Sequence, residues 1–198
     1  MNHEKNDPAE TILEAALETI LVEKISGARL RQVAKRAGMS QGNLHYYYPA
    51  KDDLFQSLLD HLLKTFVQER KSILADRSVQ PEEKLRFFFD QQIELIRRVK
   101  EVVIFFDFWV QGTKDAKIRK KIQKMYARWR EDIRAVIEEG VQKGVFSSAK
   151  TSQMPALLAS VMDGASLQYL MDAGSLDLQA YFDTAYEMAA GMLAAHQR

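Results

Sequence analysis

Apolar residues recur at helical spacing along almost the whole chain, and this pattern decides the fold class. Ile12, Ala16 and Ile20 lie four residues apart, and a longer stripe of the same period runs from Leu54 to Val67. No segment alternates with a period of two over any length, and the 198 residues include only 4 prolines and 9 glycines. The sequence therefore predicts an all-α protein of about nine helices, with a three-helix domain over residues 1–50 and a helical domain over residues 51–198.

Several classes of protein do not fit the composition. The chain has no cysteine, so it has no disulfide and no zinc–thiolate site. Its start is polar, unlike a signal peptide. Its longest apolar run, 102–110, is interrupted by Asp107 and is too short to span a bilayer. We therefore expect a cytoplasmic protein that does not enter a membrane.

Motifs of catalysis and metal binding are missing from the sequence. The four histidines (His3, His45, His61 and His196) are scattered, and no glycine-rich phosphate loop or nucleophile–base spacing occurs. We expect no catalytic residue, no metal ion and no cofactor. A helical enzyme is the rival interpretation, and a tightly held metal ion or measurable turnover would reveal one.

Charge is unevenly distributed, although the net charge is only +1. Six basic residues and no acidic residue lie between Lys24 and Lys51, whereas six acidic residues precede them. A basic segment in a neutral chain is typical of a local phosphate-binding surface. The alternative is an ordinary solvated face, and charge alone does not decide between them.

The basic segment also has the outline of a helix-turn-helix. A short helix fits residues 30–37, Gly38 provides a turn, and Ser40 can cap a second short helix that continues to about Tyr47. The second helix of this motif lies in the major groove of DNA. Its Gln41 and Asn43 carry amides that can present a donor and an acceptor to a base edge. The alternative is a helical bundle whose tyrosines form a core cluster.

Residues 30–54 (LRQVAKRAGMSQGNLHYYYPAKDDL) resemble the N-terminal signature of TetR-family regulators. The resemblance places the core positions at Val33, Ala34, Leu44 and Tyr48. Together with the composition of the segment, it implies a set of DNA-contacting residues. These are Arg29, Arg31, Ser40, Gln41, Gly42, Asn43, His45, Tyr46, Tyr47 and Lys51. The chain departs from the family pattern at His45, where tyrosine is usual, and at Lys24, where glycine is common.

The same resemblance implies that the rest of the chain binds a ligand and forms a homodimer through its last two helices, at about 152–172 and 176–195. Small residues among aliphatic ones in 156–170 would allow close helix packing between two subunits. The alternative is that both helices pack only on their own chain. Trp109, Trp129 and the pattern in 161–168 further resemble the choline-responsive branch of the family, although less specifically.

Aromatic residues are concentrated in the middle of the chain, and three consecutive phenylalanines at 87–89 cannot all face one core. We expect the effector to contact His61, Phe88, Gln92, Phe105, Trp109, Tyr126, Trp129 and Tyr169. Asp107 is expected to be exposed or paired with Arg97, Arg98 or Lys100, the alternative being a cation site among aromatic rings. Asp163 has the same two interpretations, and a partner on a neighbouring helix is favoured.

These observations together predict a sequence-specific regulator of transcription. We expect a repressor that binds a palindromic DNA operator and is released by a small, largely apolar effector. The alternative from another class is a helical adaptor that has kept the fold and lost DNA binding, and the acid-free basic segment argues against it.

Overall fold

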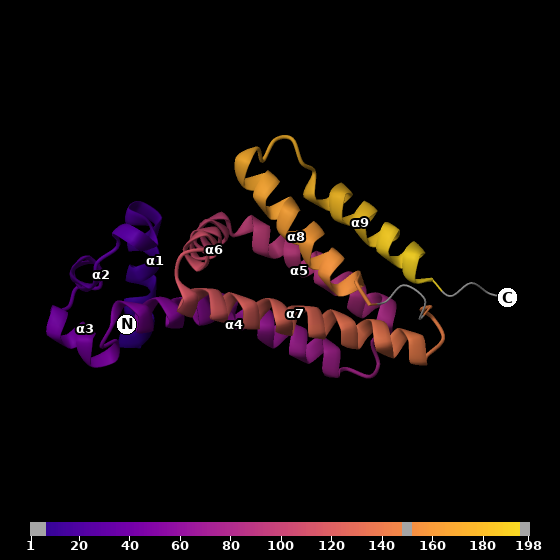
Figure 1. The fold of residues 1–198 in the computed structure, drawn as a ribbon, viewed down its shortest axis with the longest axis horizontal. Coiled ribbons are helices and arrows are strands. Elements are labelled where there is room, and N and C mark those ends of the chain that lie inside the picture. The colour runs from indigo at the N-terminus through magenta and orange to yellow at the C-terminus, as the bar shows by residue number, and fades with distance from the viewer. Residues whose placement is uncertain (1–6, 148–151, 195–198) are drawn as a thin grey trace, which may run out of the picture. The chain divides into compact units, whose positions relative to one another are not determined.

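The computed structural model describes residues 7–147 and 152–194, and the described residues form nine α-helices (Figure 1). The helices are α1 (Pro8–Gly27), α2 (Leu30–Arg36), α3 (Gln41–Tyr47), α4 (Lys51–Ala75), α5 (Pro81–Arg97), α6 (Val99–Gly112), α7 (Ala116–Gln142), α8 (Met154–Met171) and α9 (Leu178–Leu193). Extended pairing within the described ranges is limited to an isolated bridge between Phe146 and Ala194. The prediction of an all-α fold is confirmed. Over the same ranges, every helix is too short or too polar to cross a bilayer.

Contacts within the chain divide the described residues into two compact units. Unit 1 contains the residues up to 65 together with 103–120, and unit 2 contains 66–102 together with the residues from 121 onward. The helix α4 therefore contributes to both units. The predicted domain boundary after residue 50 stays a prediction.

Unit 1 has a core formed by the apolar stripe of α1. Ile12, Ala16 and Ile20 are almost fully buried, and they belong to one cluster with Leu44 of α3 and Leu54 of α4. The carboxylate of Asp7 accepts the main-chain N–H of Ala9 at 3.0 Å and caps α1, which begins at a proline as the sequence predicts. The core thus holds the two short helices α2 and α3 against α1.

The backbone of α1 is interrupted near its end. Lys24 has φ 60° and ψ 165°, which places it in a region that glycine adopts readily and that L side chains avoid. The chain re-enters the helix at Ile25, whose side chain is buried in the core of unit 1. The family pattern that the sequence resembles has glycine at this position, and the backbone angles of Lys24 are ones that glycine adopts readily.

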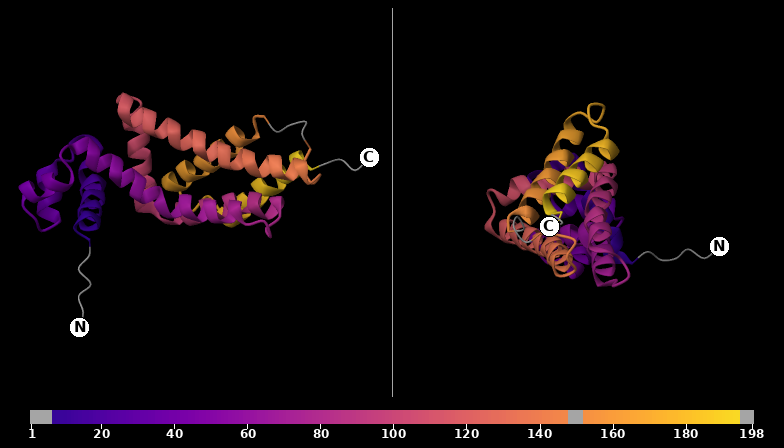
Figure 2. Two further views of the ribbon diagram at one scale, coloured as in Figure 1. Left: turned by 90° about the horizontal axis from the view of Figure 1, so that it is seen from below. Right: turned by 90° about the vertical axis from the view of Figure 1, so that its right-hand side faces the viewer.

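Unit 2 packs α5 against α8 and α9, and the two views of Figure 2 show α8 beside α9. Phe88 and Phe89 are buried in its core, and Phe89 contacts Phe182 of α9 with ring centroids 6.2 Å apart. Phe87 is only partly buried, so the three phenylalanines do not share one environment, as predicted. Arg86 of α5 also forms an ion pair with Asp183 of α9.

Candidate nucleic-acid interface and effector site

The turn between α2 and α3 is set by local hydrogen bonds. Gly38 adopts φ +68°, the left-handed conformation predicted for it, and the N–H of Met39 donates to the carbonyl of Ala34 at 3.0 Å. The hydroxyl of Ser40 accepts the N–H of Asn43 at 3.1 Å and so caps α3. Ser40 is exposed, and a hydroxyl that accepts one hydrogen bond also carries an O–H donor.

The helix α3 is anchored by one side and leaves the other side exposed. Leu44 is the one buried residue of α3, and it packs with Val33 and Ala34 of α2 in the core of unit 1. Every other residue of α3 is exposed. Tyr46 is 82% exposed, which is far more than a core residue would show, and its ring meets that of Tyr47 edge-on. The alternative of a tyrosine core cluster is therefore wrong for Tyr46 and Tyr47.

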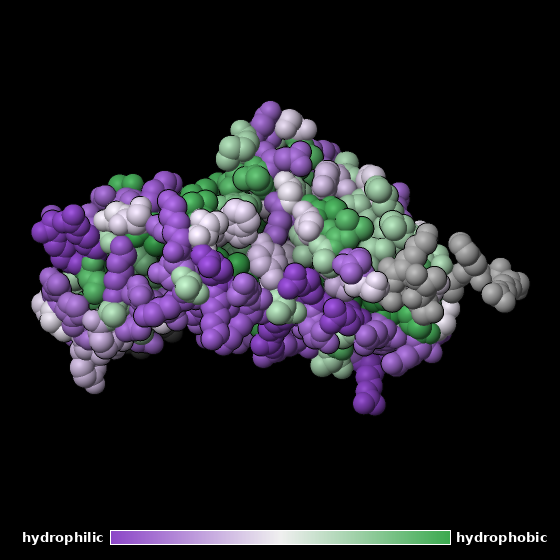
Figure 3. All heavy atoms as spheres, in the orientation of Figure 1, coloured by the Kyte–Doolittle hydropathy of each residue, from purple (hydrophilic) through white to green (hydrophobic). Residues whose placement is uncertain are grey.

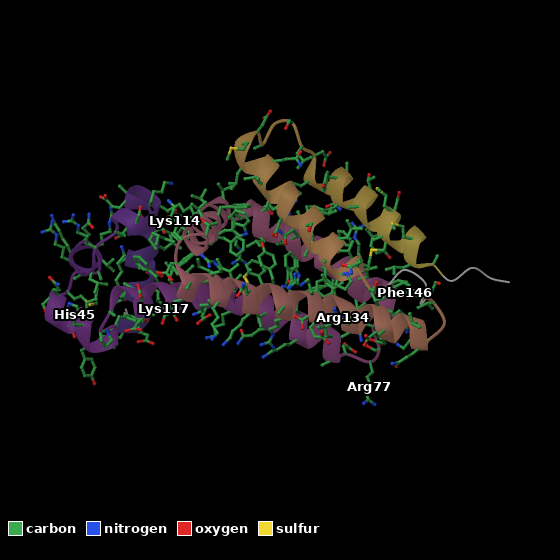
Figure 4. The ribbon with its side chains drawn as sticks, viewed as in Figure 1. His45, Arg77, Lys114, Lys117, Arg134 and Phe146 are labelled. Atoms are coloured by element: carbon green, nitrogen blue, oxygen red, sulfur yellow. The ribbon has the colours of Figure 1, made fainter. Side chains whose placement is uncertain are left out.

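His45 is held on both sides of its ring. Its Nδ1 lies 3.2 Å from the carbonyl oxygen of Pro49, and its Nε2 lies 3.3 Å from the amide nitrogen of Gln41. Both partners are within four residues of His45, so the segment from α3 to the start of α4 is linked internally. Figure 4 shows His45 on α3.

Basic residues lie before and after α3 in the sequence. Arg29 and Arg31 are exposed at the start of α2, and Lys51 begins α4 with its ammonium 5.2 Å from the centre of the Phe55 ring. Burial lowers the pKa of Lys51, the charge of Arg29 lowers it further, and Asp52 opposes both. Asp52 is itself within 3.7 Å of Lys117 in the same unit. A phosphate oxygen of DNA could form a charge-assisted hydrogen bond with the ammonium of Lys51.

In unit 2, polar groups lie beside the buried aromatic residues. The hydroxyl of Tyr126 on α7 donates to Asp163 of α8 at 2.5 Å, and the Tyr126 ring stacks on Trp129 at 6.3 Å. The buried amide of Gln92 donates to the hydroxyl of Ser166 at 2.8 Å. Burial raises the pKa of Asp163 to about 6, and the hydrogen bond from Tyr126 opposes that shift.

A separate groove of about 490 Å³ lies on unit 2. It is lined by α4, α5, the residue after α5 and the start of α9. Its lining includes Phe66, Phe87, Asp90, Arg97, Arg98 and Gln179, and Arg98 stacks over the Phe66 ring at 5.0 Å. None of the predicted effector residues lines this groove.

An exposed apolar surface lies on α8 and α9. Leu157, Leu167 and Met171 of α8 are between 48% and 75% exposed, and Met188 and Met192 of α9 are 65% and 43% exposed. Figure 3 shows hydrophobic residues gathered over these two helices. Apolar side chains this numerous on two neighbouring helices are typical of a protein–protein interface.

Comparison with known proteins gives two family matches. The profile described as bacterial regulatory proteins, tetR family, matches residues 12–58, and the profile described as BetI-type transcriptional repressor, C-terminal, matches residues 81–194. The chain belongs to the TetR family.

Similar proteins extend the TetR family likeness over nearly the full length. A TetR transcription regulator from Haloarcula marismortui shares the fold with a TM-score of 0.84 and 25% identity, over 94% of this chain and 98% of that one. A putative regulator from Saccharomonospora viridis in complex with choline has a TM-score of 0.80 and 22% identity, over 96% and 98%. The fatty acid metabolism regulator protein of Bacillus subtilis is 19% identical over 89% of this chain and 91% of its own length. Regulators of this family are DNA-binding transcription factors and not enzymes, and some bind small molecules.

The TetR-type helix-turn-helix brings all the predicted DNA-binding residues into one unit, and their contacts with DNA stay a prediction. The predicted effector residues divide between the two units. Phe88, Gln92, Tyr126, Trp129 and Tyr169 belong to unit 2, where they are buried or partly buried. His61, Phe105 and Trp109 belong to unit 1, and His61 and Trp109 are exposed there.

The predicted surroundings of Asp163 are confirmed, whereas those of Asp107 are not. Asp163 has its partner on a neighbouring helix, as predicted, and its raised pKa adds it to the candidate effector residues. The expectation for Asp107 is wrong, because this residue is half-buried and its carboxylate accepts the main-chain N–H of Ile25 at 2.6 Å. No side-chain pattern could reveal that partner, since it is a main-chain group released by the break at Lys24.

Proposed function

We propose that this TetR-family regulator is a repressor that binds a palindromic operator as a homodimer and is released by a small, largely apolar effector. The observation that carries the proposal is the anchoring of α3 by Leu44 alone. All the other side chains of α3 are exposed, in a segment without a single acidic residue from 24 to 51. Amides for base edges and cations for phosphates are then available on the same surface.

Dimerisation through α8 and α9 is supported by the exposed apolar residues on both helices. Two copies of this pair, related by a two-fold axis, would bury Leu167, Met171 and Met188 in a four-helix interface. The two reading helices of such a dimer would enter successive major grooves about 34 Å apart, and a two-fold protein matches a palindromic site.

The effector site is proposed for the region around Asp163 and Tyr126 in unit 2. Phe88 and Trp129 belong to the buried cluster against which Tyr126 packs, and such rings favour an apolar molecule. The amide of Gln92 offers it a polar partner. Asp163 has a raised pKa, and its causes include no neighbouring cation, so a positive centre on the effector would compensate the buried charge. The choline complex of the Saccharomonospora viridis protein supports an effector of this kind.

Fluorescence anisotropy tests DNA binding directly. The full-length protein is titrated onto random-sequence duplexes and onto the DNA upstream of its own gene, at several salt concentrations. A repressor of this type binds the upstream DNA with a steep salt dependence and saturates at an even number of chains per site. Failure to bind any duplex at low salt would favour the adaptor instead.

Two variants test where the effector binds. Tyr126→Phe removes the donor to Asp163 and should weaken release of the operator by choline or a similar small cation. Phe87→Ala alters the separate groove, so it should leave that response intact if the effector binds near Asp163. A response lost in Phe87→Ala and kept in Tyr126→Phe would place the effector in the groove.

A further inference from the structure

His45 uses both ring nitrogens within the segment that is proposed to read DNA. Nδ1 lies 3.2 Å from the Pro49 carbonyl oxygen, and Nε2 lies 3.3 Å from Nε2 of Gln41, one turn earlier on α3. A carbonyl oxygen only accepts hydrogen bonds, so Nδ1 carries the proton of the ring and donates it. The Nε2 of the neutral ring then has a free lone pair, which accepts an N–H of the Gln41 amide.

This contact fixes the orientation of an amide whose two ends differ chemically. With its nitrogen turned toward His45, Gln41 keeps Oε1 as an acceptor and a second amide hydrogen as a donor. An acceptor beside a donor matches the N6 amino group and N7 of adenine in the major groove. If the amide turned over, donor and acceptor would exchange places and the match would be lost. Gln41 begins α3, and the first residues of a recognition helix are those that approach base edges.

We propose that His45 is a positioning residue for base recognition, whose neutral ring holds the Gln41 amide in one orientation and thereby selects adenine at one position of each half-site. The inference rests on the proposed function, because it requires α3 to lie in the major groove. The alternative is that the contact between His45 and Gln41 only stabilises the fold. Both side chains are exposed, and a hydrogen bond between exposed groups adds little to the free energy of folding.

Selection from a library of randomised duplexes tests the proposal with the full-length protein. Sequencing of the bound fraction gives the base preference of wild type, Gln41→Ala, His45→Phe and the double variant. The base pair whose preference falls most in Gln41→Ala is the one that Gln41 reads. We expect wild type to favour adenine there by about 5- to 100-fold and His45→Phe by only about twofold. In the Gln41→Ala background, His45→Phe should change nothing further at that base pair.

Two further variants separate the contacts of His45. His45→Asn keeps a donor for the Pro49 carbonyl but has no acceptor at the position of Nε2, so it should lose the preference as His45→Phe does. His45→Gln places an acceptor oxygen farther along the side chain and should restore part of the preference. Thermal unfolding of each variant shows that the comparison is made on folded protein.

Three results would overturn the proposal. His45→Phe could retain the wild-type preference at the base pair that Gln41 reads. His45→Phe could lower that preference equally with and without Gln41, which would make His45 a direct reader of the base. Gln41→Ala could leave every position of the selected sequence unchanged. A wild-type protein that enriches no sequence would instead overturn the proposed function itself.

Discussion

The carboxylate of Asp107 on α6 accepts the main-chain N–H of Ile25 on α1 at 2.6 Å, across 82 residues of sequence. Both residues belong to unit 1. The N–H of Ile25 needs an outside partner because the helical backbone is broken at Lys24, directly before it. Asp107 thus acts like a helix-capping residue, because its carboxylate accepts a main-chain N–H that has lost its helical partner.

Asp107→Ala should therefore destabilise the protein. The substitution leaves a partly buried N–H without its acceptor, so we expect the free energy of unfolding to fall by about 1–3 kcal/mol. Asp107→Asn keeps an acceptor oxygen of the same reach and should cost less. Urea unfolding followed by circular dichroism measures both, and equal stability of wild type and Asp107→Ala would show that the contact contributes nothing.

Lys24→Gly should stabilise the protein, which is unusual for a glycine placed near a helix. At φ 60° and ψ 165° a side chain strains the backbone, and relieving this strain is worth about 1–3 kcal/mol, less the entropy that glycine gains in the unfolded chain. Lys24→Ala removes the same charge and keeps the strain, so it serves as the matched control. A rise in melting temperature for Lys24→Ala as large as that for Lys24→Gly would contradict the explanation.

The helices, the turn and the helix cap were predictable from the sequence, whereas the backbone break at Lys24 and the partner of Asp107 were not. The period of the apolar residues predicts the helices, and Gly38 and Ser40 predict the turn and the cap because each acts on its immediate neighbours. The resemblance to the family pattern marked Lys24 as a departure, but it did not reveal the backbone angles of this residue. The partner of Asp107 depends on tertiary packing, which a sequence pattern does not show. The same holds for the effector candidates, because the fold places His61, Phe105 and Trp109 in unit 1 and the other five candidates in unit 2.

Gly140 should not tolerate a side chain. It is buried within α7, and a methyl group built on it would overlap the ring of Phe146, which follows the helix (Figure 4). Gly140→Ala must displace that ring, so we expect a loss of about 1–3 kcal/mol of stability. Gly27→Ala is the control, because its new methyl would make only ordinary contacts with Glu23. Equal melting temperatures of Gly140→Ala and Gly27→Ala would contradict the prediction.

The raised pKa of Asp163 predicts how stability depends on pH. Its pKa is about 6 in the folded protein and 3.8 in the reference state, so between these values the folded chain binds more protons than the unfolded chain. Stability must then fall as the pH rises from about 4 to 6, by about 1–3 kcal/mol from this group. Asp163→Asn removes the titration and should be the more stable protein at pH 7. Unfolding measured from pH 4 to 7 checks this, and parallel curves for the two proteins would contradict it.

Lys51 and Arg31 should contribute to DNA binding through phosphates and not through bases. Each phosphate contact releases counterions, so Lys51→Ala and Arg31→Ala should each lower the slope of log affinity against log salt by about one, with little change in sequence preference. Lys71→Ala is the matched control, because it removes one exposed lysine from the part of α4 that belongs to unit 2. The slopes are obtained by titrating each variant onto the same duplex between low and moderate salt. If the slope fell equally in Lys71→Ala, the effect would reflect net charge alone, and the phosphate contacts assigned to Lys51 and Arg31 would be wrong.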